Sequence, residues 1–276
     1  MSPDKVVADA TEAVAGIGDG WSLAVGGFGL AGVPVVLVEA VLASGARDLT
    51  VVSNNCGTDG AGLGLLLEQR RIARVIASYV GENREFARQY LAGELTVELT
   101  PQGTLAERLR AGGAGIGAFY TPTGVGTLVA EGGLPWRYHP DGSVALTSPP
   151  KEVRTFAGRE MVLEEAIVTD AALVRAAVAD RAGNCVFHAA ARNFNPPAAM
   201  AGRLTVVEAE RVVDIGALAP DEIHLPGVFV QRVLALRPEQ AARKGIEKRT
   251  TRPRPPGAAT APSNGHAPTG GSARSS

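Results

Sequence analysis

Residues 19–34 read Asp-Gly-Trp-Ser-Leu-Ala-Val-Gly-Gly-Phe-Gly-Leu-Ala-Gly-Val-Pro. The apolar stretch at 22–25 predicts a short strand, and Pro34 suits the first turn of a helix. Four glycines, at positions 26, 27, 29 and 32, separate the two elements. Glycine permits backbone conformations and close approaches that a side chain prevents. We therefore expect a loop whose N–H groups face a ligand at a helix N-terminus, a favourable place for an anionic or thioester-bearing cofactor.

Strand and helix patterns alternate through the first half of the chain. Strands are expected at residues 22–25, 49–53, 75–79 and 95–99, and helices at residues 34–44, 63–70, 84–91 and 104–110. This alternation predicts an α/β fold in which helices flank a mostly parallel sheet. The chain also predicts an earlier helix between residues 6 and 17, a hairpin at 138–146 around Asp141-Gly142, and strands at 171–178, 185–187 and 204–207.

The last forty residues differ from the rest of the chain. Residues 237–276 carry eight lysines or arginines against two glutamates and are rich in Pro, Gly and Ala. Such a segment buries too little apolar surface to offset its ordering entropy. We expect one α/β domain over residues 1–236 and a disordered basic tail over 237–276. A basic tail can contact nucleic acid or a membrane, but this composition favours a solvated extension, so neither partner is expected.

The composition predicts a cytoplasmic protein. No apolar run approaches the ~18 residues of a membrane span, and residues 1–19 lack the apolar core of a signal peptide. Cys56 and Cys185 are the only cysteines and form no C-x-x-C pattern, so free thiols are expected. The four histidines are scattered without the spacing of metal ligands, so no metal site is expected.

The glycine loop permits more than one interpretation. Residues 27–32 match the pattern G-x-G-x-x-G, which suggests a dinucleotide-binding oxidoreductase. That function also requires a carboxylate at the end of the second strand, where this chain has Asn54 and Asn55. A phosphate-binding P-loop would need Lys-Ser/Thr after Gly32, which is missing. Tight packing of strand against helix, without any ligand, is the remaining alternative.

Polar loops follow the predicted strands. Residues 26–32, 54–62 and 100–103 are rich in Gly, Asn, Gln and Thr. In an open parallel sheet, ligands bind at the carboxyl ends of the strands, and neutral amides suit a polar ligand or a developing oxyanion. Asn54, Asn55 and Gln102 are therefore candidate site residues. The structural alternative is that the asparagines form turns and that Gln102 only begins a helix.

At these residues the chain resembles the first (α) subunit of the class I 3-oxoacid CoA-transferases, especially the succinyl-CoA:3-ketoacid type. The resemblance covers about residues 4–236. It is carried by the glycine-rich stretch 19–34 and by Ser53-Asn54-Asn55, residues 78–83, Thr100-Pro101-Gln102-Gly103, residues 119–124, Leu163-Glu164-Glu165-Ala166 and Ala191-Arg192-Asn193-Phe194-Asn195. It implies the fold of that subunit, a coenzyme A thioester as substrate rather than as a permanently bound cofactor, and a role in ketone body metabolism.

The resemblance also implies a partner. In this family a glutamate attacks the acyl-CoA, and a glutamyl-CoA thioester forms before CoA passes to the acceptor acid. That glutamate belongs to a Ser-Glu-Asn-Gly motif on the second (β) subunit. The nearest string here is Gly81-Glu82-Asn83-Arg84, which lacks the serine and the final glycine. We expect Glu82 to serve a helix start and the nucleophile to arrive in a heterodimer or heterotetramer.

The residues that match the family's motifs receive its expected roles. The CoA-lining loop is Gly26, Gly27, Phe28, Gly29, Leu30, Ala31 and Gly32, with Asn54 and Asn55 near the thioester. Gln102 is the candidate oxyanion donor. Phe28 could instead plug the core beneath the loop, and Glu164 and Glu165 are expected to be structural.

Four functions remain open at this point. The first is the α subunit of a succinyl-CoA:3-ketoacid CoA-transferase. The second is the corresponding subunit of a 3-oxoadipate or other short-chain acid CoA-transferase. The third is a nucleotide-cofactor oxidoreductase, and the fourth is a non-catalytic CoA-binding homologue.

Overall fold

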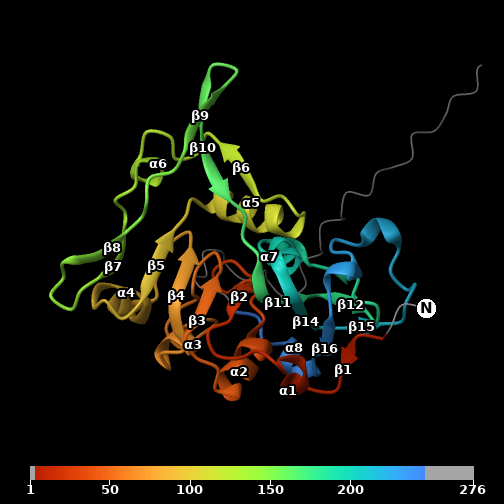
Figure 1. Ribbon diagram of the computed structural model, residues 1–276. Coiled ribbons are helices and arrows are strands. Elements are labelled where there is room, and N and C mark those ends of the chain that lie inside the picture. The colour runs from red at the N-terminus through yellow and green to blue at the C-terminus, as the bar shows by residue number, and fades with distance from the viewer. Residues whose placement is uncertain (1–3, 246–276) are drawn as a thin grey trace, which may run out of the picture.

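An eight-stranded sheet runs through residues 4–245, the part of the chain that the computed structural model describes (Figure 1). Its strand order is β1-β16-β14-β11-β2-β3-β4-β5, and every neighbouring pair is parallel. The strands are β1 (Val6–Val7), β2 (Ser22–Val25), β3 (Leu49–Val52), β4 (Ile72–Ala77), β5 (Thr96–Leu99), β11 (Thr169–Ala176), β14 (Gly202–Ala209) and β16 (Arg232–Ala235).

Helices cover both faces of this sheet. One apolar core receives α1 (Ala10–Ala13), α2 (Val35–Ser44), α3 (Gly64–Glu68) and α4 (Arg84–Leu91), and the other receives α5 (Gln102–Gly113) and α7 (Asn195–Ala201). Along β2, Leu23 and Val25 belong to the first core and Ala24 to the second. Strands buried on both faces are apolar without alternation. The predicted α/β fold with a mostly parallel, helix-flanked sheet is confirmed.

The individual elements agree with the sequence prediction to different degrees. The helix expected at 84–91 is α4, and α2 ends at Gly45, whose φ of 84° is the left-handed conformation that glycine favours. The helix expected between residues 6 and 17 is wrong, because β1 comes first and α1 is only four residues long. Val6 pairs with Val233 of β16, a partner that the local sequence does not reveal.

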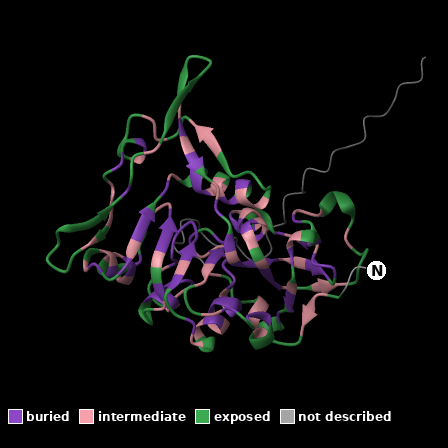
Figure 2. Ribbon diagram, in the orientation of Figure 1, coloured by how far each residue is buried: buried purple, intermediate pink, exposed green. Residues whose placement is uncertain are grey.

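Two small antiparallel sheets extend away from the main sheet and are largely exposed (Figures 1 and 2). One joins β6 (Ala118–Thr121), β10 (Arg159–Glu165) and β9 (Val153–Phe156), with α6 (Leu128–Glu131) nearby in sequence. The other is the predicted hairpin, formed by β7 (Pro135–Tyr138) and β8 (Val144–Thr147). The sequence does not predict the first sheet, since β9 is exposed at every position and lacks an apolar face.

The remaining elements are short. A three-stranded sheet contains β12 (Val178–Asp180), β13 (Cys185–Val186) and β15 (Val212–Val213), and 3-10 turns lie at Ala189–Arg192, Pro220–Glu222 and Gly227–Phe229. Among the helices of residues 4–245, none combines the length and apolar character that a membrane span requires.

The glycine loop packs directly against the start of α7. A Cβ added to Gly26 would lie 2.0 Å from Oδ1 of Asn195, and one added to Gly32 would lie 2.9 Å from its Nδ2. The Asn195 amide is fully buried, donates to the carbonyls of Gly32 and Ala191, and accepts from the N–H of Arg175. At these two glycines, close packing is a sufficient reason for the missing side chain.

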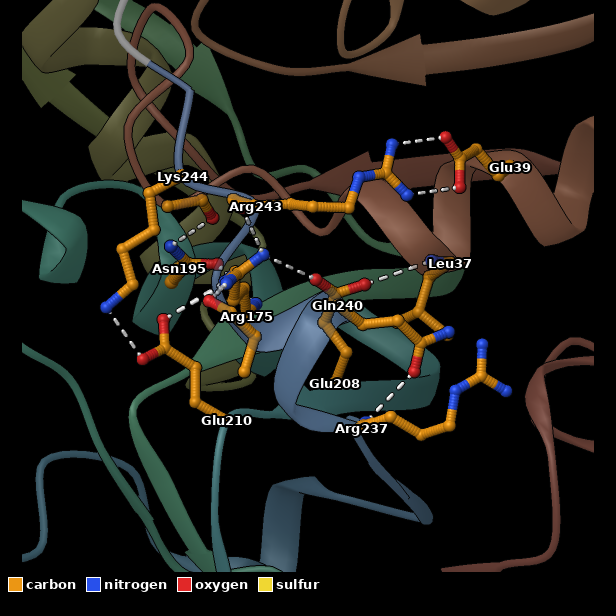
Figure 3. A network of polar contacts seen from close by, with 12 residues as sticks. Leu37, Glu39, Arg175, Asn195, Glu208, Glu210, Arg237, Gln240, Arg243 and Lys244 are labelled. Carbon is orange, nitrogen blue, oxygen red and sulfur yellow. Dashed lines mark hydrogen bonds and ion pairs between the residues drawn. The ribbon is translucent and has the colours of Figure 1, made fainter.

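Part of the segment after residue 236, where the composition ends the domain, contacts the domain. Residues 237–245 belong to the predicted tail, yet α8 (Pro238–Ala241) and the residues after it contact the domain. Arg175 donates to the carbonyls of Ala241 and Arg243 at 2.8 and 3.0 Å, and Arg243 pairs with Glu39 (Figure 3). The composition of the segment alone does not predict these long-range polar contacts. The rest of the predicted disordered tail, residues 246–276, lies outside the described residues.

Two truncations test this boundary. Removing residues 237–276 should lower the free energy of unfolding, because each buried Arg175 donor left without its carbonyl costs about 1–3 kcal/mol. Removing only residues 250–276 should change it little, as the composition of that segment predicts. Arg243→Ala, which keeps the carbonyl and deletes only an exposed ion pair, should cost about 1 kcal/mol or less. Urea unfolding measures all three, and equal stability of the two truncated proteins would place the boundary back at 236.

A second prediction concerns the loop. Gly26→Ala forces a methyl group into the Asn195 amide, and overpacking of this kind typically costs about 1–3 kcal/mol. Gly117→Ala is the matched control, since Gly117 is exposed and a Cβ there meets nothing within 4 Å. Thermal and urea unfolding should show a loss only for Gly26→Ala. Equal stability of the two variants would contradict the packing explanation.

Candidate functional site

The carboxyl ends of four adjacent parallel strands bring the predicted polar residues together. Gly29 follows β2, Asn54 and Asn55 follow β3, Ser78 follows β4, and Gln102 follows β5 as the first residue of α5. The N–H of Gly29 donates to Oδ1 of Asn55 at 3.0 Å, and Nε2 of Gln102 donates to Oδ1 of Asn54 at 2.7 Å. Three loops that are far apart in the sequence therefore meet at one edge of the sheet.

The two asparagines lie inside the protein. Asn54 is 0% exposed and Asn55 is 3% exposed, so both side chains are buried. The Ser78 hydroxyl donates toward Asn54, with its main-chain oxygen at 2.9 Å and Oδ1 at 2.7 Å. Within residues 4–245, Nδ2 of Asn55 is buried without a hydrogen-bond partner. An orphaned buried donor of this kind is unusual in a native protein.

The glycine loop folds back on itself. Phe28 and Ala31 exchange hydrogen bonds of 3.0 and 2.9 Å between their main chains, and Gly29 and Gly32 have φ values of 57° and 72°. Thr58 and Ala61 make the same exchange in the loop after β3. These turns explain most of the remaining glycines, because their backbone conformations favour glycine.

One alternative for this loop is wrong, and one expectation is contradicted for four of its N–H groups. Phe28 is 43% exposed, so it does not plug the core beneath the loop. The N–H groups of Gly26, Phe28, Gly29 and Ala31 are hydrogen-bonded to protein acceptors rather than left facing a ligand. The apolar ring of Phe28 and the exposed edge of the turn are what the loop presents outward.

The helix after the loop does not offer a free N-terminus either. The carboxylate of Glu208, which is fully buried on β14, accepts the N–H of Leu37 at 3.0 Å in the first turn of α2 (Figure 3). An internal carboxylate therefore satisfies this helix N-terminus, a place where anionic ligands such as phosphates commonly bind. Burial raises the pKa of Glu208 to about 7, and the N–H groups of Leu37 and Val36 and the guanidinium of Arg175 oppose that rise.

Arg175 connects this carboxylate to its surroundings. It lies on β11, is 5% exposed, and pairs with Glu208 at 3.2 Å and with Glu210 at 3.1 Å. Lys244 adds a contact to the other oxygen of Glu210 at 2.8 Å. A cavity of about 240 Å³ lies beside these charges. Its lining includes Leu30, Gly32, Arg175, His188, Glu210 and Lys244.

Two buried carboxylates away from this edge, Glu164 and Glu98, are held in ion pairs. Glu164 is buried on β10 and accepts from Lys151 at 2.6 Å, in agreement with the expected structural role. Glu98 pairs with Arg74 and Arg108, and although burial acts to raise its pKa, the two cations hold that pKa below its usual range. Glu82 is exposed just before α4.

The thiols are unsuited to catalysis in this state. Cys56 and Cys185 are free and fully buried, and burial raises the pKa of each to about 12. A thiol, rather than the nucleophilic thiolate, is therefore the stable form.

The sequence singles out Asn54, Asn55 and Gln102 but not the residues that hold them. Ser78 and Asn195 enter only as parts of segments that match the family, and Arg175 and Glu208 are not identified. The position of Ser78 directly after a strand is a signal of the same kind as that of Asn54. Glu208 gives no such signal, because a single glutamate inside an apolar strand acquires its partners from α2 and β11.

Comparison with known proteins is consistent with this geometry. The family model described as coenzyme A transferase matches residues 7–236. The chain is 62% identical over 249 residues to the first (α) subunit of the probable succinyl-CoA:3-ketoacid coenzyme A transferase of Mycobacterium tuberculosis, covering 90% of this chain and 99% of that one. It is 54% identical to the mitochondrial succinyl-CoA:3-ketoacid coenzyme A transferase 2 of Homo sapiens, covering 89% of this chain and 47% of the human protein.

A solved structure shares the fold. The acyl-CoA transferase YdiF of Escherichia coli O157:H7, crystallised as a thioester complex with CoA, superimposes with a TM-score of 0.71 at 22% identity. The match covers 87% of this chain and 49% of the YdiF chain. The family model over nearly the whole domain, together with the high identity to full-length relatives, shows that this chain is a member of the coenzyme A transferase family.

Proposed function

We propose that this chain is the α subunit of a succinyl-CoA:3-ketoacid CoA-transferase, which moves CoA from succinyl-CoA to a 3-oxo acid such as acetoacetate. The relatives of that name match along almost their whole length when they are separate α subunits. A 3-oxoadipate or other short-chain acid remains the alternative acceptor. The oxidoreductase alternative is wrong for this chain, because it belongs to the coenzyme A transferase family.

The observation that carries the proposal is a cluster of neutral donors at the carboxyl edge of the sheet. Gln102, Asn54 and Asn55 lie within one hydrogen-bonded group. Within residues 4–245, no carboxylate oxygen and no cation is hydrogen-bonded to any of these three amides. Neutral donors stabilise charge that develops on a thioester oxygen during attack, and removal of one such donor typically costs ~10²–10³ in rate. We assign that donor role to Gln102.

The glycine loop is the proposed CoA-lining segment. Its turn exposes Phe28 beside Asn55, and Leu30 lines the adjacent cavity, so both offer apolar contact for a long and partly apolar ligand. Contacts to remote parts of CoA could supply binding energy that is used at the reacting carbonyl. The CoA thioester enters this scheme as substrate, and no permanently bound cofactor is proposed.

The attacking glutamate is proposed to come from the partner subunit, within a Ser-Glu-Asn-Gly motif. Its carboxylate oxygen attacks the thioester carbonyl, the acyl group and CoA exchange places, and succinate leaves as the glutamyl-CoA thioester forms. The acceptor acid then takes CoA from that thioester. The human relative supports a two-part enzyme, because this chain matches only 47% of that longer protein. The expected cytoplasmic location stays a prediction.

Complementation tests the two-chain proposal. The purified chain alone should convert succinyl-CoA and acetoacetate to succinate and acetoacetyl-CoA at no measurable rate, because the nucleophile is missing. Mixing it with a partner that carries Ser-Glu-Asn-Gly should restore turnover, whereas a partner with Gln in place of that glutamate should not. Turnover by this chain alone would refute the proposal.

The same system tests Glu82. Glu82→Gln in this chain should leave turnover of the complex within about two-fold, since the side chain is exposed at a helix start. Trapping the thioester intermediate and locating it by mass spectrometry should label the partner. Label on Glu82 would assign the nucleophile to this chain instead.

A further inference from the structure

The three amides at the site have a fixed hydrogen-bond direction, and one main-chain group determines it. An amide side chain can be rotated by 180°, so its oxygen and nitrogen must be assigned from their neighbours. A main-chain N–H leaves no such choice, because it can only donate. Gly29 supplies that N–H to Asn55 at 3.0 Å, so the atom of Asn55 facing it must be the oxygen.

The orientation of the Asn55 amide determines that of the Asn54 amide. The same Oδ1 of Asn55 lies 3.3 Å from the terminal nitrogen of Asn54. Since two oxygens without a proton would repel each other there, Asn54 must present its NH₂ group to Asn55. Its oxygen then faces the opposite way, where Ser78 and Gln102 donate to it at 2.7 Å each.

The last amide whose orientation is fixed in this way is that of Gln102. The atom of Gln102 that faces the Asn54 oxygen must be its NH₂ nitrogen, which uses one of two N–H groups in that bond. Gln102 is exposed, whereas both asparagines are buried, so its second N–H is available outside the series. We propose that the Gly29 N–H, through Asn55 and Asn54, makes Gln102 present an N–H rather than its carbonyl oxygen to the bound thioester.

The amide series (the Gly29 N–H, Asn55, Asn54 and Gln102) makes Asn54 and Asn55 positioning residues. This inference rests on the proposed function, in which Gln102 acts as the donor. It also gives the glycine loop a second task besides lining the ligand. The turn at Phe28–Ala31 points the Gly29 N–H at Asn55. The conformation of the loop therefore determines which amide atom Gln102 presents to the bound thioester.

Two charge-matched variants in the complex of this chain with its partner test the inference. Asn54→Asp places a carboxylate oxygen against the Asn55 oxygen, so the new acid should need a proton there, and its protonated form restores the original pattern. Asn55→Asp still accepts from Gly29 and Asn54, so it should stay ionised and titrate below the assay range. Both variants introduce one carboxyl group at nearly the same place, so they differ in the expected protonation state of that group.

The expected readout is a pH profile of kcat. Relative to wild type, kcat of Asn54→Asp should rise at least ten-fold between pH 8 and pH 6, while that of Asn55→Asp should keep the wild-type profile. KM for succinyl-CoA should change less than kcat in both. Ser78→Ala removes one hydrogen bond to Asn54 without reversing the series, so its kcat should keep the pH profile of wild type, whatever its absolute value.

A measurement without turnover separates failure of this inference from failure of the proposed function. In the deuterated, ¹⁵N-labelled complex, one Nε2 proton of Gln102 should be protected from solvent exchange and the other should not. Asn54→Leu should expose both, with thermal unfolding confirming that the variant is folded. Equal protection of both protons in wild type would overturn the inferred orientation of the amides. Matching pH profiles for the two aspartate variants would overturn it as well. An inactive wild-type complex that still shows the protection pattern would refute only the proposed function.

Discussion

The buried ion pair between Arg175 and Glu208 is the interaction on which the rest of the structure depends. Transferring two charges out of water costs several kcal/mol per ion, and only good geometry with further hydrogen bonds offsets that cost. Here the guanidinium contacts two carboxylates and two main-chain carbonyls, and Glu208 also accepts from the first turn of α2. One pair therefore joins two central strands, the helix after the glycine loop and the C-terminal segment.

That arrangement leaves the α2 N-terminus satisfied by an internal carboxylate. The proposed site therefore rests on the neutral amides after β3 and β5. A site built from neutral donors can stabilise developing negative charge without repelling an incoming carboxylate. The proposed division of labour follows from this chemistry, with the oxyanion donor on this chain and the nucleophilic carboxylate on the partner.

Much of this could be predicted from the sequence, and the failures share a cause. The alternation of short apolar strands and helices predicted the parallel sheet, and residues directly after strands predicted which polar side chains would meet. Phe28, which was expected to line the CoA site, had a place in the core as its alternative, and its 43% exposure excludes that alternative. The predictions of a helix at 6–17 and of a free helix N-terminus both failed because a partner distant in the sequence decides the local structure.

The sequence by itself determined the fold class, the family resemblance and the identities of Asn54, Asn55 and Gln102, because these depend on local periodicity and on residues at strand ends. Only the tertiary structure decided what the glycines do, which anion occupies the α2 N-terminus and which way the amides point. The physical reason is that hydrogen-bond direction and close packing are properties of pairs. Gly26 meets Asn195, and the Gly29 N–H meets Asn55, only after the strands and loops that carry them are brought together.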